Sequence, residues 1–280
     1  MKIAQKLAQV LGAVLLVTGL TGCPRDEEEK PLTGPEARQA LDESAFAAEA
    51  QALTAEEVEI TTDFTLGAGA RKAAENLRDF YQSQAPCAEV TLAEATVTIN
   101  FGVEAGCTWR GRTWQGQHAI QIVKAEEGAV EVHHTWTDFT NGRVTLDGTA
   151  QVTWSLADKS RTVAHDLTWS RGDKVASGTG TSTQTLLEPA LGLAGGLAIE
   201  GDRAWTGPAG GTWSLSMEGV EARPQDPVPQ AGTYRLVTPN DKAAALIFER
   251  VDVARIRVTL TSAGKSFSFI VLANGQVEAA

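Results

Sequence analysis

Alternating apolar and polar positions after Cys87 predict an antiparallel β-meander. β-branched and aromatic residues alternate with polar ones over short runs, and Gly, Asn-Gly or Asp-Lys turns separate these runs about every 10 to 15 residues. About 10 to 12 strands are expected, and an open sheet of that size tends to curl or to fold into two layers. The expected fold is therefore mainly β, a large twisted meander in the form of a curled sheet, a sandwich or an open barrel. The clearest strands are expected at residues 113–123, 129–139, 143–155, 161–170, 233–238, 244–249, 251–261 and 265–272.

One or two helices are expected before the sheet. The segment from Gly34 to about Leu53 is rich in alanine and glutamate, and its apolar residues recur at helical spacing. Pro35 suits a first helical position. A second helix is expected from about Ala70 to Gln84, where apolar and aromatic residues cluster.

The turn at Asn141 and Gly142 decides how two central strands pair. A two-residue turn is usual for Asn-Gly, but it would send Trp136 away from the apolar face of the next strand. A three-residue loop with Gly142 left-handed in a bulge shifts the register by one residue. Because a shift of one residue exchanges the two faces of a strand, matching apolar faces favour the longer loop, with Trp136 opposite Leu146.

The first residues have the features of a bacterial lipoprotein signal. Lys2 and Lys6 give a basic start, residues 7–20 form an apolar run that is short for a membrane span, and Leu20-Thr21-Gly22-Cys23 follows. This order resembles a lipobox, in which the cysteine is lipidated and becomes the first residue after cleavage. An ordinary secretory signal with an accidental cysteine is the alternative. We expect lipidation at Cys23, because several acyl chains give stable anchoring in a membrane.

The pattern divides the chain into five segments. Pro24 stands where retention signals for the inner membrane commonly carry aspartate, so an outer-membrane location is favoured, on either its periplasmic or its surface face. The segment after it is charged and contains several prolines, which is typical of a disordered tether. The expected segments are a signal peptide (1–22), an acidic tether (23–34), a helical N-terminal segment (35–86), an antiparallel β-domain (87–223) and C-terminal strands that continue the same sheet (224–280).

Charge excludes two classes of partner. The chain has a net charge of -11, and loss of residues 1–22 removes two lysines and no acidic residue, which leaves -13. Such a surface repels nucleic acid and anionic lipid headgroups. The sequence contains no Walker, Rossmann or zinc-finger motif. We therefore expect no cofactor and no nucleic-acid partner.

Cys87 and Cys107 are expected to form a disulfide. The chain has three cysteines, and one of them is the expected lipidation site. An even pair outside the cytoplasm is most simply oxidised. A redox or metal site would favour a close Cys-x-x-Cys pair, which the sequence lacks.

Part of the sequence resembles a family of uncharacterised β-rich bacterial lipoproteins. The family pattern is C-x-T-V-T…I-T-I-D-F-G…G-C…G-R-x-x-x-G, and a C-terminal part resembles Pro229-Gln-Ala-Gly-Thr-Tyr here. The resemblance covers about residues 80–275 and implies a β fold and lipidation, but no activity. Asn100 replaces the aspartate of the family's Asp-Phe-Gly step. The matching stretches are Cys87-Ala-Glu-Val-Thr, Thr96-Val-Thr-Ile-Asn-Phe-Gly, Gly106-Cys107 and Gly111-Arg-Thr-Trp-Gln-Gly116.

Two adjacent histidines and a nearby aspartate do not share one face of a strand. His133 points away from the face of His134, and Asp138 lies about 13 Å along the strand from His134. If the preceding hairpin loop is residues 126–128, His118 lies opposite Trp136 and diagonal to both His134 and Asp138. A His118–Asp138 hydrogen bond is then expected. A two-histidine site would lack a close third ligand, so core or rim histidines are expected and no metal.

Five of the seven tryptophans lie on or near the central meander. Trp136 alternates with apolar residues, which favours core packing. Trp109 and Trp114 lie in polar sequence beside Arg110 and Arg112, which predicts a position nearer the surface. Ring-rich β faces bind glycans or lipid chains in some proteins. The candidate ligand contacts are therefore Trp109, Trp114, His118, His134 and Trp136.

These patterns favour a lipid-anchored protein of the cell envelope that is not an enzyme. No serine or cysteine lies beside a credible base, so no catalytic residue is expected. The favoured interpretation is a binding or scaffolding protein, held to the membrane by its N-terminal lipid, with an unidentified partner. The alternative is a carrier that holds a lipid or other apolar ligand in the curve of the sheet. A carrier needs an unfilled apolar cavity, whereas a scaffold has a filled interior.

Overall fold

A computed structural model describes residues 31–65, 69–102, 106–124 and 129–279. The predicted signal peptide, Cys23, most of the predicted tether and the predicted loop at residues 126–128 lie outside these residues. The described chain is mainly β, as predicted, and its strands pair antiparallel after two α-helices. The elements are α2 (Gly34–Thr65), α3 (Ala70–Gln84), β1 (Glu89–Ala93), β2 (Thr96–Asn100), β3 (Cys107–Trp109), β4 (Arg112–Lys124), β5 (Ala129–Thr140), β6 (Thr145–Ser155), β7 (Ser160–Arg171), β8 (Lys174–Leu186), the 3-10 segment η2 (Pro189–Gly195), β9 (Leu197–Thr206), β10 (Thr212–Ala222), β11 (Ala231–Val237), β12 (Ala243–Asp252), β13 (Arg255–Ser262), β14 (Lys265–Leu272) and β15 (Val277–Ala279).

The chain forms two compact units. The central unit comprises the described residues between 53 and 185, and the split unit comprises residues 31–52 together with residues 186–279. The predicted boundary between residues 223 and 224 falls between β10 and β11, and these two strands pair directly with each other. In the described part of the chain, no helix is both long and apolar enough to cross a membrane.

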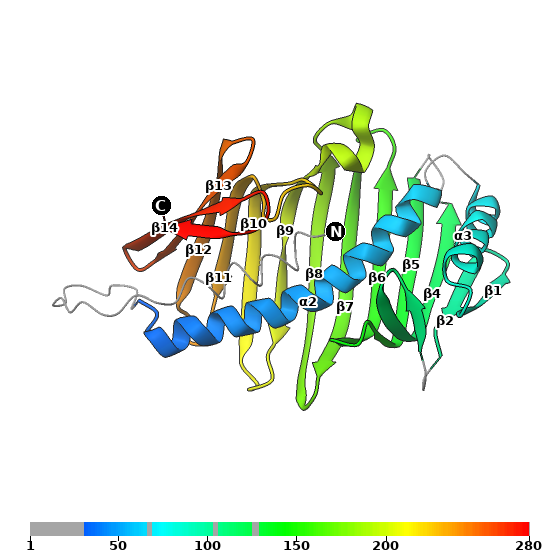
Figure 1. The fold of residues 1–280 in the computed structure, drawn as a ribbon, viewed down its shortest axis with the longest axis horizontal. Coiled ribbons are helices and arrows are strands. Elements are labelled where there is room, and N and C mark those ends of the chain that lie inside the picture. The colour runs from blue at the N-terminus through cyan, green and yellow to red at the C-terminus, as the bar shows by residue number, and fades with distance from the viewer. Residues whose placement is uncertain (1–30, 66–68, 103–105, 125–128, 280) are drawn as a thin grey trace. The chain divides into compact units, whose positions relative to one another are not determined.

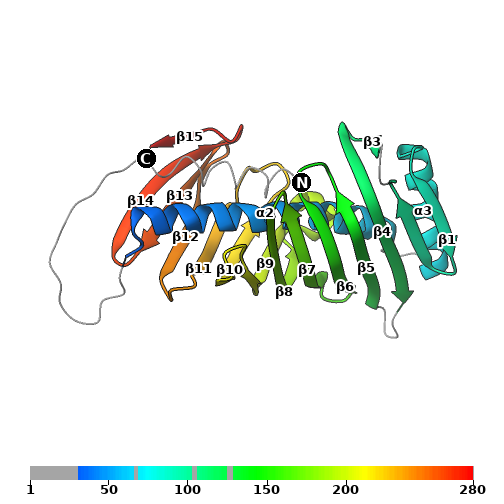
Figure 2. The same ribbon diagram turned by 90° about the horizontal axis from the view of Figure 1, so that it is seen from below.

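The strands of the central unit follow chain order, with β3 added beside β4 (Figures 1 and 2). One face of this sheet is apolar and is covered by α3 and the C-terminal part of α2. The opposite face carries mainly threonine, glutamine and serine, because successive strand residues alternate between faces. The largest fully buried side chains on the covered face and its helices include Leu53, Leu77, Tyr81, Ile99, Phe101, Trp114, Ile120, Trp136, Phe139, Leu146, Trp154 and Leu167.

The predicted second helix is confirmed with the predicted bounds, whereas the first is longer than expected. Helix α2 continues through residues 54–65, which contain several threonines and β-branched residues. Threonine hydroxyls are tolerated there because they donate to carbonyls of the same helix: Thr61 Oγ1 to Glu57 at 2.9 Å and Thr62 Oγ1 to Val58 at 2.8 Å.

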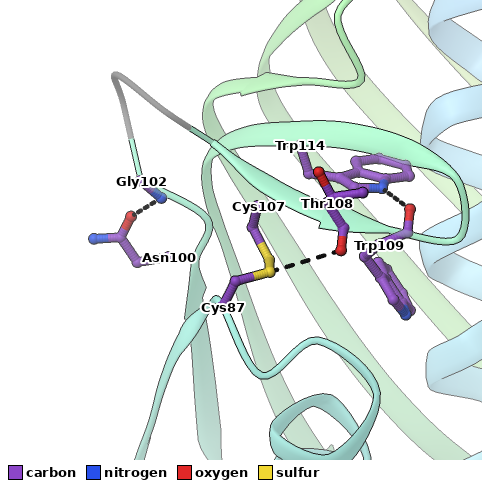
Figure 3. The surroundings of a disulfide bond; sticks show 7 residues. All are labelled: Cys87, Asn100, Gly102, Cys107, Thr108, Trp109 and Trp114. Carbon is purple, nitrogen blue, oxygen red and sulfur yellow. Dashed lines mark hydrogen bonds between the residues drawn. A yellow bond between two sulfur atoms is a disulfide. The ribbon is translucent and has the colours of Figure 1, made fainter.

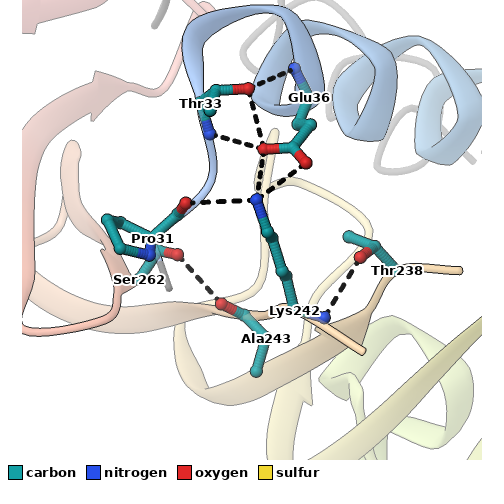
Figure 4. Close-up of polar contacts among 7 residues, drawn as sticks. All are labelled: Pro31, Thr33, Glu36, Thr238, Lys242, Ala243 and Ser262. Carbon is teal, nitrogen blue, oxygen red and sulfur yellow. Dashed lines mark hydrogen bonds and ion pairs between the residues drawn. The ribbon is translucent and has the colours of Figure 1, made fainter. Parts of the chain in front are cut away.

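The first turn of α2 is fixed by a reciprocal cap in the split unit (Figure 4). The Thr33 N–H donates to Glu36 Oε2 at 2.8 Å, and the Glu36 N–H donates to Thr33 Oγ1 at 3.4 Å, which is a capping box. Lys242 Nζ donates to both Glu36 carboxylate oxygens, at 2.7 and 2.6 Å. The hydrogen bond from Lys242, with those from Thr33, lowers the pKa of Glu36 to about 2.

The register between β5 and β6 differs from the prediction by two residues, although the faces agree. Trp136 pairs with Gly148 rather than Leu146, and the turn is a four-residue loop between Thr140 and Thr145. Gly142 is left-handed, as predicted, with φ of 81°. The four-residue loop alone would exchange the faces of β5, and an extra residue of β5 near Asp138 restores the facing of its earlier part.

The extra residue of β5 depends on a close backbone approach from β4. Asp138 has φ of 48°, and Gly116 lies opposite it with φ of 81°. A Cβ atom at Gly116 would lie 2.1 Å from the Asp138 carbonyl oxygen, so only glycine fits there. A pairing between two strands therefore sets the register, and the turn sequence alone does not contain this information.

The split unit pairs β9 to β15 in chain order. Phe248, Ile256 and Val271 form a buried cluster with Val228 from the preceding loop. Trp205 and Trp213 stack at 6.2 Å between ring centroids. The described residues form fifteen strands, which exceeds the expected 10 to 12. Several short strands, such as β1, β3 and β15, give weak sequence patterns.

Candidate functional site

A continuous chain of four polar side chains lies inside the central unit. Tyr81 Oη donates to Glu57 Oε2 at 2.5 Å, and His118 Nδ1 lies 3.1 Å from the same oxygen. His118 Nε2 lies 3.0 Å from His134 Nδ1. All four side chains are at most 1% exposed. We call Tyr81, Glu57, His118 and His134 the polar chain.

Four different elements contribute to the polar chain. Glu57 lies on α2, four residues after buried Leu53, and Tyr81 lies on α3, four residues after buried Leu77. Positions four apart share a helix face, so both side chains point into the layer beneath the helices. His118 and His134 lie on the helix-covered face of β4 and β5. His118 pairs with Trp136, as predicted.

Proton positions along the polar chain follow from its partners. An ionised Glu57 can only accept, so Tyr81 and His118 Nδ1 both donate to it. A single proton lies between His118 Nε2 and His134 Nδ1, because one nitrogen must donate and the other must accept. Glu57 Oε1 and His134 Nε2 are buried and have no hydrogen-bond partner within the described residues.

Burial controls the titration of this cluster. Burial lowers the pKa of His134 well below its usual value, and repulsion from His118 and from Arg161 lowers it further. Burial also raises the pKa of Tyr81 well above its usual value, and the nearby negative charge of Glu57 raises it further. Burial beneath the helices therefore favours the neutral form of His134 and the protonated form of Tyr81.

Aromatic rings fill the space around the two histidines. The ring centroid of Trp136 lies 5.1 Å from that of His118 and 5.4 Å from that of His134. Phe139 lies 5.8 Å from His118 and 5.4 Å from Trp114. At such distances the rings are in contact, so no ligand fits between them.

The two tryptophans predicted near the surface are buried instead. Trp109 and Trp114 are 4% and 0% exposed, respectively. The Cys87–Cys107 disulfide is formed, as predicted, and holds residue 107 at the start of β3, which pairs with β4 (Figure 3). Trp114 Nε1 then donates to the Trp109 carbonyl at 3.0 Å, so the indole is satisfied inside the protein.

The arginines beside these tryptophans pair with a glutamate of helix α2, a contact that the sequence analysis did not predict. Arg110 and Arg112 each make an ion pair with Glu56, at 3.4 and 3.3 Å. The Arg110 guanidinium lies 4.6 Å from the centroid of the Trp109 ring. The arginines therefore cover the tryptophan layer beside α2, and they do not leave it open to solvent.

The expected His118–Asp138 hydrogen bond is wrong. Both ring nitrogens of His118 already have partners, Glu57 and His134. Asp138 is exposed at the extra residue of β5, where its N–H donates to Asp147 Oδ1 at 2.8 Å. His133 lies on the opposite face from His134, as predicted, and contacts Glu131.

The structure thus gathers all five candidate ligand-contact residues in one buried layer. Contact of Trp109, Trp114, His118, His134 and Trp136 with a ligand stays a prediction. Glu57 and Tyr81, the carboxylate and the phenol of the polar chain, were not expected. Continuation of the helical period past Leu53 would have placed Glu57 on the buried stripe. Among the described residues, no group of three or more histidine, cysteine or acidic side chains is arranged to hold a metal ion.

Comparison with models of known families, with curated proteins and with solved structures finds no match for this chain.

Proposed function

We propose that this chain is a lipid-anchored, non-catalytic protein of the cell envelope, whose sheet is a rigid surface for a binding partner. The observation that carries the proposal is the close packing around the polar chain of the central unit. The titratable groups under its helices bond to one another, and the rings around them are in contact. Such an interior supports a scaffold better than a reaction site or an enclosed ligand cavity.

The open face of the central sheet is the surface that a partner would meet. The rows across its strands present mainly hydroxyl and amide groups, which can both donate and accept hydrogen bonds. Thr149 is exposed at the middle of one row. That row runs Thr98, Ala119, Thr135, Thr149, Asp166, Thr179 across six paired strands.

A photo-crosslinking residue at Thr149 is expected to give a discrete high-mass product in intact cells. The same residue at Asp173, in the exposed turn between β7 and β8, is the matched control and is expected to give none. Products would be resolved by electrophoresis and mass spectrometry. Absence of a product at Thr149, or equal products at both positions, would remove the proposed binding face.

Lipid anchoring rests on the sequence Leu20-Thr21-Gly22-Cys23. We expect the Cys23→Ser variant to move almost entirely from the membrane fraction to the soluble fraction, because the acyl chains that anchor it would be lost. Cell fractionation and labelling with a fatty-acid analogue would measure this. A variant that stays in the membrane fraction would contradict anchoring through Cys23.

A carrier function is the second candidate, and one feature of the split unit favours it. A row of apolar residues on the core face of its sheet is only partly covered, and Phe267 at its end is 41% exposed. An apolar chain could lie along this row. Its members are Met217, Tyr234, Leu246, Leu260 and Phe267.

Native mass spectrometry of the mature chain without its lipid separates the two candidates. The scaffold predicts the mass of the polypeptide alone. A lipid-sized adduct would favour the carrier, and it should then be lost in Leu246→Gln but kept in Ile247→Gln. Ile247 is the matched control, since it lies next to Leu246 on the opposite face of β12.

A further inference from the structure

The polar chain is the hydrogen-bonded link between the helices and the sheet at the centre of the central unit. Glu57 and Tyr81 come from α2 and α3, whereas His118 and His134 come from β4 and β5. The pairs join segments far apart in sequence, since Glu57 and His118 are 61 residues apart. We propose that the polar chain is an acid-sensitive latch, which holds α2 and α3 on β4 and β5 and releases them when both histidines are protonated.

The number of protons on the two histidine rings explains why a second added proton breaks the hydrogen bond between His118 and His134. With both rings neutral, His118 Nε2 accepts from His134 Nδ1–H. One added proton gives the pair a single positive charge, and the bond between the rings persists because one proton still lies between them. Glu57 balances that charge. A second added proton places hydrogens on both facing nitrogens, only 3.0 Å apart, so the bond must break.

The surroundings oppose a second positive charge. Arg161 from β7 is 4% exposed, and its positive charge faces the same layer. His165 lies in the same row as His134, with Ala150 between them. Two carboxylates face the cluster, Glu57 within it and Glu56 at its edge, but Glu56 is already paired with two arginines. The titratable and charged groups around the polar chain are Glu56 and Glu57 on α2, Tyr81 on α3, Arg110 in the turn before β4, Arg112 at the start of β4, Arg161 and His165 on β7, and His133 on the opposite face of β5.

Release of the helices would expose apolar surface that is otherwise covered. Ile120 and Trp136 lie on the same face as the histidines and are at most 1% exposed. At acidic pH the apolar face of the central sheet would therefore be exposed to solvent in addition to its polar face.

The direction of the pH dependence follows from the buried state of His134. Its pKa is lowered in the folded protein, whereas an exposed histidine titrates near 6.5. Below about pH 6.5 the open state therefore binds more protons than the closed state. The contribution to closure is fully present above that pH and is lost as the pH falls toward the lowered pKa. Each proton bound only in the open state raises the opening equilibrium constant about tenfold per pH unit.

Hydrogen exchange at a series of pH values tests the latch. In the wild-type chain, we expect the amides of α3 and of residues 53–65 to open more readily below pH 6.5, by up to about tenfold per pH unit after correction for intrinsic exchange. The amides of β4 to β6 should stay protected over that range. Helices and strands that open together at every pH would overturn the proposal, and this result needs no variant.

Two neighbouring histidines supply matched variants. His134→Gln removes one of the two titrating rings, so the pH slope of helix opening should fall even if opening is more frequent at neutral pH. His133→Gln changes the adjacent residue on the opposite face and should keep the wild-type slope. An equal loss of slope in both variants would overturn the assignment to His134. If His134→Gln fails to fold, Tyr81→Phe must keep the slope while increasing opening at every pH, because it removes one bond and no titrating ring.

Discussion

Replacement of Glu57 by leucine is expected to lower the free energy of unfolding by about 2–6 kcal/mol. The Tyr81 hydroxyl and His118 Nδ1–H both donate to one oxygen of this carboxylate, and all three side chains are fully buried. Leucine would leave both donors buried without an acceptor, and each lost partner costs about 1–3 kcal/mol. Urea unfolding followed by tryptophan emission would measure the loss.

Glu57→Gln separates the hydrogen bonds from the charge. Its carbonyl oxygen can accept from both donors, and its amide group would take the place of the oxygen that has no partner. We expect this variant to lose less stability than Glu57→Leu. Glu75→Gln is the control, because the partly exposed Glu75 pairs with the exposed side chains of Arg71 and Lys72, and surface ion pairs contribute under about 1 kcal/mol. Equal losses in Glu57→Leu and Glu75→Gln would contradict a role for the polar chain in holding the helices.

Removal of the disulfide by Cys87→Ser and Cys107→Ser together is expected to cost about 3 kcal/mol. The bond joins residues 20 apart in sequence, and a loop of that size restricts the unfolded chain by about this amount. Loss of the disulfide should loosen the packing of the buried tryptophans, since Trp109 and Trp114 lie on the paired strands β3 and β4 and Cys107 begins β3. Urea midpoints of the oxidised wild type and the double variant give the difference.

The reduced wild-type chain is the control for the double variant. Both lack the covalent link but differ in the serine substitutions, so their midpoints should agree. A double variant as stable as the oxidised wild type would show that the disulfide adds nothing to the unfolding free energy. A double variant much less stable than the reduced chain would assign the loss to the buried Cys107 position instead.

Local sequence patterns predicted most of the strands, helix α3 and the first part of helix α2. Period-two alternation placed β4 to β7 and β14 within a few residues, and clustered apolar and aromatic residues placed α3 at its observed bounds. The pattern missed the second half of α2, which contains threonines that favour strands in isolation. Their hydroxyls bond to the carbonyls of the same helix, and burial against the sheet compensates for low helix propensity.

The polar chain could be predicted only in part, because its members meet through tertiary packing. Alternation put His118 opposite Trp136 and separated His133 from His134, and both points are confirmed. Strand pairing alone predicts Asp138, which lies diagonal to His118, as the hydrogen-bond partner of that histidine. The actual partner, Glu57, comes from a helix that precedes the sheet, and no strand pattern contains that contact. Polar sequence around Trp109 similarly suggested exposure, whereas Glu56 on α2 binds its arginine neighbours.

Nitrogen NMR of the histidine rings tests the central claim, the bonded His118–His134 pair, most directly. The chain has four histidines, so four sets of ¹⁵N ring signals are expected. The pair predicts one proton shared between His118 Nε2 and His134 Nδ1, and a His134 ring that stays neutral as the pH falls past 6.5. A His134 ring that titrates near pH 6.5, as an exposed histidine does, would contradict the buried polar chain and the latch built on it.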